Sequence, residues 1–201
     1  MFEIFKAGGP LMWIILLCSL IALAIIFERM ITLRLRQVAP SSLREQIVEL
    51  VRSGRLTKER IEMVREHSPL GQVLAAGLYN IDHGEEAMRE SIEETGKVIV
   101  HRLGKYLNTL GTIASITPLI GLLGTVIGMI KVFTAITSSG VGDPTVLSGG
   151  ISEALITTAA GLSVGIPCLM FYRHFKGKII ELAVALEEEA IAFLDSLKGR
   201  I

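Results

Sequence analysis

The sequence predicts an all-α membrane protein with three transmembrane helices and long helices that extend into the cytoplasm. Half of the 201 residues are hydrophobic and the mean hydropathy is +0.55, which is unusual for a water-soluble domain of this length. Three windows, 7–27, 106–130 and 154–172, contain no Asp, Glu, Lys or Arg. A bilayer core needs roughly 20 apolar residues in a helix, and each window meets or nearly meets that length.

The first window is expected to be a retained anchor rather than a cleaved signal peptide. Ala22-Leu23-Ala24 resembles a cleavage site, but the apolar run continues to Phe27 and Lys6 is the only cation that precedes it. We therefore expect residues 1–6 to be an external N-terminus and residues 7–27 to be the first transmembrane helix.

The distribution of Lys and Arg predicts the orientation, because cytoplasmic segments carry an excess of these residues. Segment 28–105 holds thirteen of the twenty, and only Lys6 and Lys131 fall on the opposite side. We therefore expect a cytoplasmic helical region at 28–105, an external loop at 131–145 and a cytoplasmic C-terminal helix at 173–201.

Capping residues and apolar spacing predict short helices within the cytoplasmic region. The first follows Ser41 or Ser42 and has its apolar positions at Leu43, Ile47, Leu50 and Val51, and the second begins at Thr57. The small residues at 73–78 suit close packing between helices.

A much longer helix is expected to lead into the second transmembrane window, 106–130. The apolar pattern continues from residue 85 with no proline before Pro118. An unbroken helix over 85–130 would be about 69 Å long, enough to cross the bilayer and stand well into the cytoplasm. We favour this continuous helix. The alternative is an ordinary amphipathic helix that breaks at Gly96 or Gly104.

Composition excludes several kinds of partner. The chain has 20 Lys and Arg against 20 Asp and Glu, so we expect no nucleic-acid surface. Cys18 and Cys168 lie in apolar windows, where cysteine usually packs as a small apolar residue. The histidines lie outside the apolar windows without metal-ligand spacing, so we expect no metal ligand and no cofactor; they are His67, His83, His101 and His174.

One charged residue, Glu153, interrupts the expected third span at 146–172. It lies about 10 Å along a helix that begins at Val146. Charges at a helix centre cost about 2.5–3.5 kcal/mol on insertion scales, so such a carboxylate normally faces a bundle interior or a wet cavity. We interpret Glu153 as marking an ion or proton path. The alternative is a span that begins at Ala154, with Glu153 at the helix start in the headgroup region.

Threonines near Glu153 are further candidates for this path. Thr157 shares the helix face of Glu153, whereas Thr158 lies about 140° round the helix. Thr125 supplies a hydroxyl from the second span, as do Thr112, Ser115 and Thr117. Each hydroxyl, taken alone, is more often a packing group that bonds back to its own helix.

Both inner spans carry pairs of small residues four positions apart. The pairs are Gly124 with Gly128 and Gly161 with Gly165. Such pairs let helix backbones approach closely in a membrane, so we expect these four glycines to serve helix packing.

Two blocks of the sequence resemble a known family. The run TPLIGLLGTVIGMI at 117–130, followed by GGISEALITTAAGL at 149–162, resembles the signature of the MotA/TolQ/ExbB proton-channel family. The three-span topology is similar as well, and within the family the ExbB members look most similar.

The resemblance implies a proton-channel subunit of an energy-transducing complex in the bacterial inner membrane. It implies a homopentameric ring in contact with membrane lipids, which surrounds the single-span helices of an ExbD-like dimer. Proton flow would drive a TonB-like protein and thereby outer-membrane import of siderophores, vitamin B12 and similar ligands.

The resemblance also assigns roles to individual residues. The family's pore-facing glutamate matches Glu153, and its pore threonines match Thr125 and Thr158. Helix geometry favours Thr157 over Thr158 on the Glu153 face, so both remain candidates. A kink near Pro167, or a pore lined by two neighbouring subunits, would reconcile them.

Three other functions were considered. A TolQ-type subunit of the Tol-Pal envelope-maintenance system shares the topology, the glutamate and the threonines, whereas MotA stators have four spans. A non-conducting scaffold explains the charged region but not Glu153. An intramembrane enzyme is disfavoured because no nucleophile and base pair or HExxH ligand set appears, so we expect no enzyme activity.

Overall fold

The computed structural model describes residues 8–139 and 144–197, and in these ranges it contains helices joined by turns and no strand. The predicted all-α class is confirmed. The chain divides into two compact units. Unit 1 comprises Met1–Phe27 and Tyr106–His174, and unit 2 comprises Glu28–Lys105 and Phe175–Ile201. The expected external N-terminus at 1–6 lies outside the described residues.

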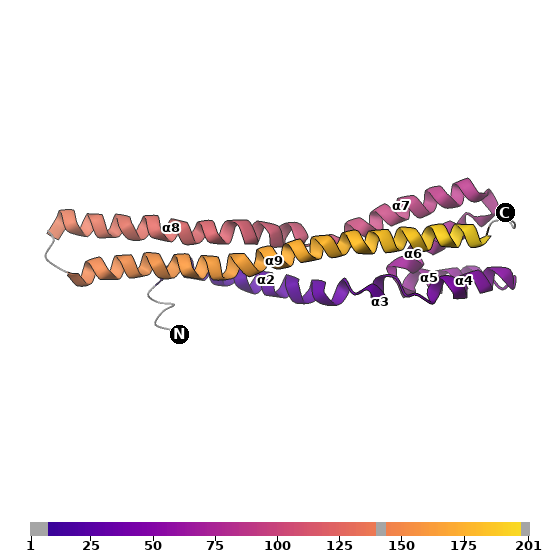
Figure 1. Ribbon diagram of the computed structural model, residues 1–201, viewed down its shortest axis with the longest axis horizontal. Helices are drawn as coiled ribbons and strands as arrows, with labels where there is room; N and C mark the ends of the chain where they lie inside the picture. The colour runs from indigo at the N-terminus through magenta and orange to yellow at the C-terminus, as the bar shows by residue number, and fades with distance from the viewer. Residues whose placement is uncertain (1–7, 140–143, 198–201) are drawn as a thin grey trace. The chain divides into compact units, whose positions relative to one another are not determined.

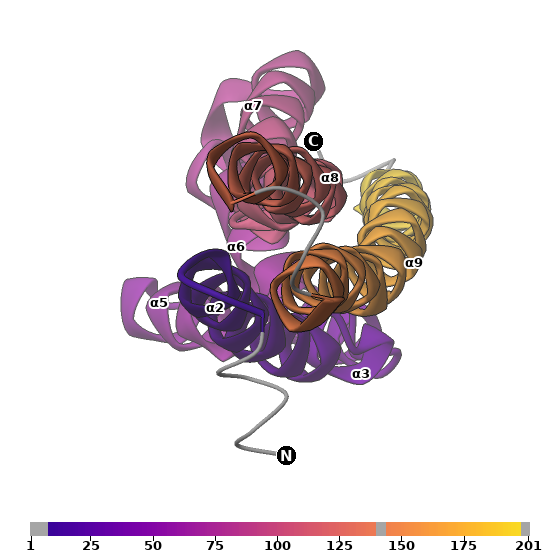
Figure 2. The same cartoon turned by 90° about the vertical axis from the view of Figure 1, so that its left-hand side faces the viewer.

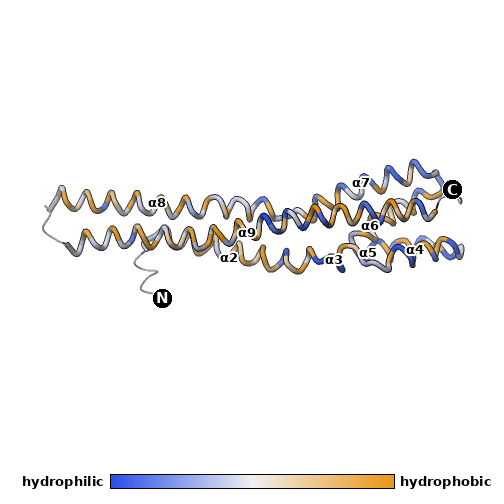
Figure 3. Tube along the Cα trace, in the orientation of Figure 1, coloured by the Kyte–Doolittle hydropathy of each residue, from blue (hydrophilic) through white to orange (hydrophobic). Residues whose placement is uncertain are grey.

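Unit 1 contains the apolar parts of three helices: α2 (Leu11–Thr32), α8 (Leu107–Ser139) and α9 (Pro144–Leu197). Each includes a stretch long and apolar enough to cross a membrane, so the chain has three candidate spans. Figure 3 shows apolar residues along α2, α8 and the first part of α9. Large apolar side chains such as Trp13, Leu119 and Met170 are exposed, which suits a surface in contact with lipid.

The α8 and α9 helices of unit 1 run antiparallel, and glycines lie where they touch. In the end-on view of Figure 2, the unit 1 parts of α2, α8 and α9 group around one another. A Cβ added to Gly121 on α8 would meet Gly161 on α9 at 3.3 Å, and one added to Gly111 would meet Tyr172 at 2.9 Å. These contacts run in opposite order along the two helices, as Figure 1 also shows.

Unit 2 is built from short helices followed by one longer helix. They are α3 (Leu35–Val38), α4 (Leu43–Arg52), α5 (Lys58–His67), α6 (Pro69–Tyr79), the 3₁₀ helix η1 (Ile81–His83) and α7 (Glu85–Leu103). The C-terminal part of α9, from Phe175, completes the unit. Its fully buried large side chains include Leu70, Leu74, Met88, Leu182 and Phe193.

The short helices α4 and α5 begin where the sequence predicts. Ser42 and Thr57 occupy their N-cap positions, but neither side chain makes a capping hydrogen bond. Ser68 caps α6, where its hydroxyl accepts a hydrogen bond from the Gly71 amide at 3.0 Å. Pro69 is the first residue of α6, a position that proline tolerates because the first helical amides need no partner within the helix.

The predicted continuous helix over 85–130 is wrong, and the alternative break at Gly104 is observed. Helix α7 ends at Leu103 and α8 begins at Leu107, with Tyr106 at a φ of 65°. The buried Arg29 guanidinium donates a hydrogen bond of 2.9 Å to the Leu103 carbonyl. A helix end leaves carbonyls without partners, and this contact from a distant side chain satisfies one of them.

The connection between α8 and α9 is shorter than the loop expected at 131–145. Helix α8 continues to Ser139 and α9 begins at Pro144. The expected boundary rested on the charge of Lys131, but the residues that follow contain neither glycine nor proline before Gly140, so the backbone stays helical. Helix α9 is a single helix of 54 residues.

Candidate functional site

Glu153 forms an ion pair with Lys131, which joins α9 to α8 within unit 1. The Lys131 ammonium donates to both carboxylate oxygens, at 2.7 Å to Oε1 and 2.8 Å to Oε2. The carboxylate side chain is 19% exposed, whereas the lysine side chain is 51% exposed. The pair therefore presents its cation outward and its anion inward.

Helix geometry explains why these two residues meet across the antiparallel pair. A Cβ on Gly128 would lie 2.7 Å from the Gly150 carbonyl and 2.8 Å from Ala154, so Gly128 is level with this part of α9. Lys131 follows three residues later on α8, and its backbone therefore lies about one turn nearer the N-terminus of α9 than that of Glu153. Side chains on a helix lean toward its N-terminus. Because α8 and α9 run in opposite directions, the two side chains lean toward each other.

Few other charges are available to this carboxylate. In the described part of unit 1, the Lys, Arg, Asp and Glu residues are Lys131, Glu153 and Arg173. Arg173 lies twenty residues beyond Glu153 on α9, or about 30 Å along the helix. Lys131 is therefore the cation within reach of Glu153 among the described residues of this unit.

The start of the described chain forms another wall of the site. Gly9 has a φ of +71°, and a Cβ added to it would collide with Glu153 Oε1. The carbonyl of the preceding Gly8 accepts a hydrogen bond of 2.9 Å from the Thr157 hydroxyl. Glycine is needed at position 9 both for its backbone conformation and for the close approach to the carboxylate.

The three candidate threonines make different contacts. Thr157 is buried, and its hydroxyl also lies 2.7 Å from the Glu153 carbonyl on its own helix. Thr158 donates instead to the Gly121 carbonyl of α8 at 2.8 Å. Thr125 donates back to Leu122 on its own helix at 2.6 Å. Among the described residues, Thr157 is thus the threonine that shares a hydrogen-bonded group with Glu153 and the Gly8 segment.

The four glycines expected to serve helix packing all lie against the opposite helix. A Cβ on Gly124 would approach Thr157 to 2.6 Å, and one on Gly161 would lie 2.7 Å from the Thr117 carbonyl. Gly165 faces the ring of Pro118, at 2.5 Å, and Gly128 faces the Gly150 carbonyl. Larger side chains at these positions would separate α8 from α9 and so move Lys131 away from Glu153.

The three other α8 hydroxyls considered in the sequence bond back to their own helix. Thr112 donates to Asn108, Ser115 to Gly111 and Thr117 to Ile113, over 2.7–2.9 Å in each case. These contacts agree with the role expected for a single hydroxyl in a span, which is to pack and to bond back to its own helix.

Sequence reasoning missed Lys131, Gly8 and Gly9 as parts of the site. In the sequence Lys131 serves as evidence of orientation, but its place near the end of the second span, with a glutamate near the start of the third, is also a signal for an ion pair. The Gly8-Gly9 pair just before Pro10 was a weaker signal, because paired glycines before a helix are common in turns.

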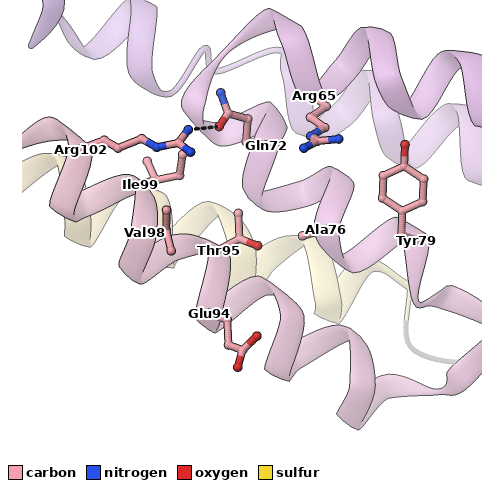
Figure 4. A pocket seen from close by; sticks show the side chains of 9 residues that line it. All are labelled: Arg65, Gln72, Ala76, Tyr79, Glu94, Thr95, Val98, Ile99 and Arg102. Atoms are coloured by element: carbon pink, nitrogen blue, oxygen red, sulfur yellow. Dashed lines mark hydrogen bonds between the residues drawn. The ribbon is translucent and has the colours of Figure 1, made fainter.

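Unit 2 contains a separate open pocket of about 440 Å³ between α5, α6 and α7 (Figure 4). Arg102 donates to Gln72 at 3.3 Å at one end of it. At the other end Tyr79 donates its hydroxyl to Glu62 at 2.7 Å, which lowers the pKa of Glu62 and raises the pKa of Tyr79. The arginines of this pocket lie near carboxylate and amide side chains, so its lining does not indicate a binding site for an anion or for a cation.

Comparison with known proteins identifies the family. The sequence profile described as the MotA/TolQ/ExbB proton channel family matches residues 65–188, more than half of the chain. The chain belongs to this family. The matched range includes the ion pair of Lys131 and Glu153, the three candidate threonines and the four packing glycines. A membrane protein with three candidate spans, as seen here, fits a family of proton channels.

Relatives from two branches of the MotA/TolQ/ExbB family are similar to the chain. A Synechocystis protein named as an ExbB-like biopolymer transport protein is 35% identical over 84% of this chain and 68% of its own length. The biopolymer transport protein exbB1 of Vibrio cholerae is 27% identical over 80% of this chain and 72% of its own length. The Tol-Pal system protein TolQ of Haemophilus influenzae is 37% identical over 43% of this chain and 36% of its own length.

Proposed function

We propose that this chain is the ring-forming, proton-conducting subunit of an energy-transducing complex in the bacterial inner membrane. Five copies surround the single-span helices of an ExbD-like dimer, and proton flow through the complex drives a TonB-like protein. The N-terminus is periplasmic, and unit 2 lies in the cytoplasm. The complex powers outer-membrane import of siderophores, vitamin B12 and similar ligands.

The observation that carries this proposal is the isolation of Glu153 in an apolar unit. Among the described residues of unit 1 it is the one carboxylate, and it lies within the part of the chain that matches the proton channel family. An ionisable side chain in a membrane span costs free energy and normally marks an ion or proton path. The names of the ExbB-like relatives support the choice of an ExbB-type complex.

The mechanism requires a partner, because a single carboxylate cannot complete a proton relay. A proton enters from the periplasmic side, passes an acidic group of the partner near Glu153, continues past Thr125 and Thr158 or Thr157, and leaves into the cytoplasm. Neutralising the partner's carboxylate lets its helix step round inside the ring. One elementary charge that crosses 100 mV releases about 2.3 kcal/mol, which drives each step.

Proton flux into proteoliposomes tests the conducting role. The full chain, purified with its single-span partner, is compared with Glu153→Gln and with Glu188→Gln, an exposed glutamate of unit 2 on the same helix. We expect Glu153→Gln to reduce flux at least tenfold and Glu188→Gln to leave it unchanged. A Glu153→Gln complex that conducts like the wild type would exclude Glu153 from the path.

Growth assays distinguish the TonB-type role from the TolQ alternative. Cells whose only copy carries Glu153→Ala are grown on iron-chelated medium with a siderophore, and protein abundance is checked by blotting. Loss of growth at normal abundance, with detergent resistance intact, supports the TonB-type role. Normal growth with new detergent sensitivity would assign the chain to envelope maintenance instead.

A second candidate role for Glu153 is structural, and the ion pair with Lys131 specifically favours it. In that case the carboxylate holds α8 to α9, and both Glu153→Asp and Glu153→Gln impair assembly before they impair flux. Native mass spectrometry of the purified variants separates the roles. Intact complexes that have lost flux support conduction, whereas dissociated complexes support the structural role.

A further inference from the structure

The two members of the ion pair at the candidate site differ in how much of each side chain is exposed. The ammonium of Lys131 reaches both oxygens of Glu153, so the carboxylate is engaged on both of its acceptor atoms. The lysine is about half exposed while the glutamate is largely covered. The lysine side chain therefore has room to move away from the pair, whereas the carboxylate is held in place.

The carboxylate is also enclosed on the side away from the lysine. The Gly9 backbone contacts Oε1 so closely that no Cβ would fit between them. The Gly8 carbonyl is tied to Thr157 on the next turn of α9. With Lys131 on α8 and Gly9 before α2, Glu153 is enclosed by neighbours from three parts of unit 1.

Among the described residues of unit 1, Lys131 is the cation within reach of Glu153. In the described part of unit 1 the helices packed at this level offer no other Lys, Arg, Asp or Glu, and Arg173 and His174 lie at the far end of the unit's α9 segment. An opposite charge within hydrogen-bonding distance favours the ionised form of a carboxylate. Without Lys131, an ionised carboxylate at this position would lose its described cation, and an unpaired charge inside an apolar unit costs free energy.

We propose that Lys131 is a positioning residue that holds Glu153 ionised and fixed between α8, α9 and Gly9 until the proton arrives. This inference rests on the proposed function. When a proton binds to an oxygen of Glu153, the carboxylate becomes a neutral carboxylic acid and its attraction to the ammonium ends. Lys131 keeps its three protons and turns away from Glu153, which becomes free to pass its proton on. Loss of that proton restores the carboxylate and the pair.

Two measurements on the purified complex test this role. One is proton flux as a function of pH in proteoliposomes. The other is the infrared band of the protonated Glu153 side chain, which is assigned by its loss in Glu153→Gln. For Lys131→Met we expect the pH of half-maximal flux to rise by about one unit or more, and the band to persist to correspondingly higher pH. Lys131→Arg keeps the cation and is expected to stay within a few tenths of a unit of the wild type.

A matched control is Lys97→Met in unit 2. Lys97 pairs with Glu93 at 2.8 Å, but both side chains are exposed to solvent. We expect this variant to leave the pH profile of flux and the infrared band unchanged. A purely structural ion pair at Lys131 would lower the amount of assembled complex without moving either midpoint.

The outcomes separate this inference from the proposed function. If Glu153→Gln abolishes flux but Lys131→Met has the wild-type pH profile and band, the role of Lys131 is overturned and the channel remains. If the wild type does not conduct, the proposed function fails. The infrared comparison needs no flux, and equal bands in Lys131→Met and the wild type would then overturn the role of Lys131 as well.

A chemical rescue covers the case in which Lys131→Met does not accumulate. Lys131→Cys is prepared in a chain whose Cys18 and Cys168 are replaced by alanine, and one sample is measured before and after aminoethylation. The reagent restores an ammonium at the position of the lysine, which is accessible because that side chain is half exposed. We expect labelling to return both midpoints to the values of the parent chain with Lys131. Unchanged midpoints after complete labelling would contradict the proposal.

Discussion

The two units pack by different means. In unit 1, α8 and α9 touch through glycines, so backbone lies against backbone at Gly121 and Gly161. In unit 2, the core consists of large side chains such as Leu74, Met88 and Phe193, which are fully buried. A lipid environment supplies no hydrophobic drive between helices, so close backbone approach stabilises unit 1, whereas burial of apolar area stabilises unit 2.

The two units also differ in how their charged side chains are paired. Unit 2 has exposed pairs between neighbouring turns, such as Arg89 with Glu85 and Lys97 with Glu93. Such surface pairs contribute about 0–1 kcal/mol and are weakened by salt. Unit 1 brings together Lys131 and Glu153 from two different helices. Unit 2 also joins α4 to α9 through Arg44 and Glu189, so what sets unit 1 apart is that its described ion pair lies among segments that otherwise carry almost no charge.

The largest expected effect is a cavity in the core of unit 2. Leu74→Ala removes a side chain that is 0% exposed, so we expect it to lower the free energy of unfolding by about 2–5 kcal/mol. Leu35→Ala, at a site that is 49% exposed, is the control and should change it little. Thermal unfolding of the full chain in detergent measures the effect, and hydrogen exchange should locate it in α6 and α7. Equal effects of the two substitutions would mean that unit 2 is not stabilised by this core.

A smaller effect is expected from a methyl group at the helix contact of unit 1. The Cβ of Gly161→Ala would lie 2.7 Å from the Thr117 carbonyl and 3.0 Å from the Gly121 Cα, which are backbone atoms. We expect a cost of about 1–3 kcal/mol, measured by SDS titration of the detergent-solubilised chain.

Gly177→Ala on the same helix sharpens this test. No atom lies within 4 Å of a Cβ added at Gly177, in unit 2. Alanine is favoured over glycine inside a helix by about 0.5–1 kcal/mol, so this substitution should stabilise slightly. If both alanines had the same sign of effect, the glycines of unit 1 would not be required for close packing.

The smallest effect concerns an exposed hydrogen bond in unit 2. Tyr79→Phe removes the hydroxyl that is the largest cause of the lowered pKa of Glu62, with the nearby Arg65 charge as a lesser cause. The pKa of Glu62 should therefore rise toward its ordinary value, as measured by NMR titration of the isotope-labelled chain.

The sign of the accompanying change in stability follows from the direction of that shift. A lowered pKa in the folded state contributes stability above the unfolded pKa, and this contribution is lost as the pH falls through the folded pKa. Tyr79→Phe should therefore lose slightly less stability on acidification than the wild type. An unchanged titration of Glu62 would contradict the contact.

Local rules predict most of the fold. The apolar windows correspond to α2, α8 and α9, and α4 and α5 begin directly after Ser42 and Thr57, as expected. The break at Gly104 could not be predicted with the same certainty, because the pattern of apolar residues continues through it. It depends on Arg29, seventy-four positions away in the sequence, whose guanidinium contacts the Leu103 carbonyl.

The candidate site was predicted only in part. Glu153 and the neighbouring Thr157 follow from the cost of a charge in an apolar segment and from helix periodicity. The partnership with Lys131 depends on how far α8 extends and on its register against α9, and the contacts of Gly8 and Gly9 depend on where the chain turns before α2. Both are tertiary facts that a single helix pattern does not contain.

The hydroxyls of Thr125, Thr157 and Thr158 have one more consequence. Each has a single hydrogen, and each lies within bonding distance of a backbone carbonyl. A hydroxyl whose hydrogen is used in this way can only accept a further hydrogen bond. Any water molecule that reaches these side chains must therefore point a hydrogen at their oxygens, so each threonine offers water an acceptor and no donor.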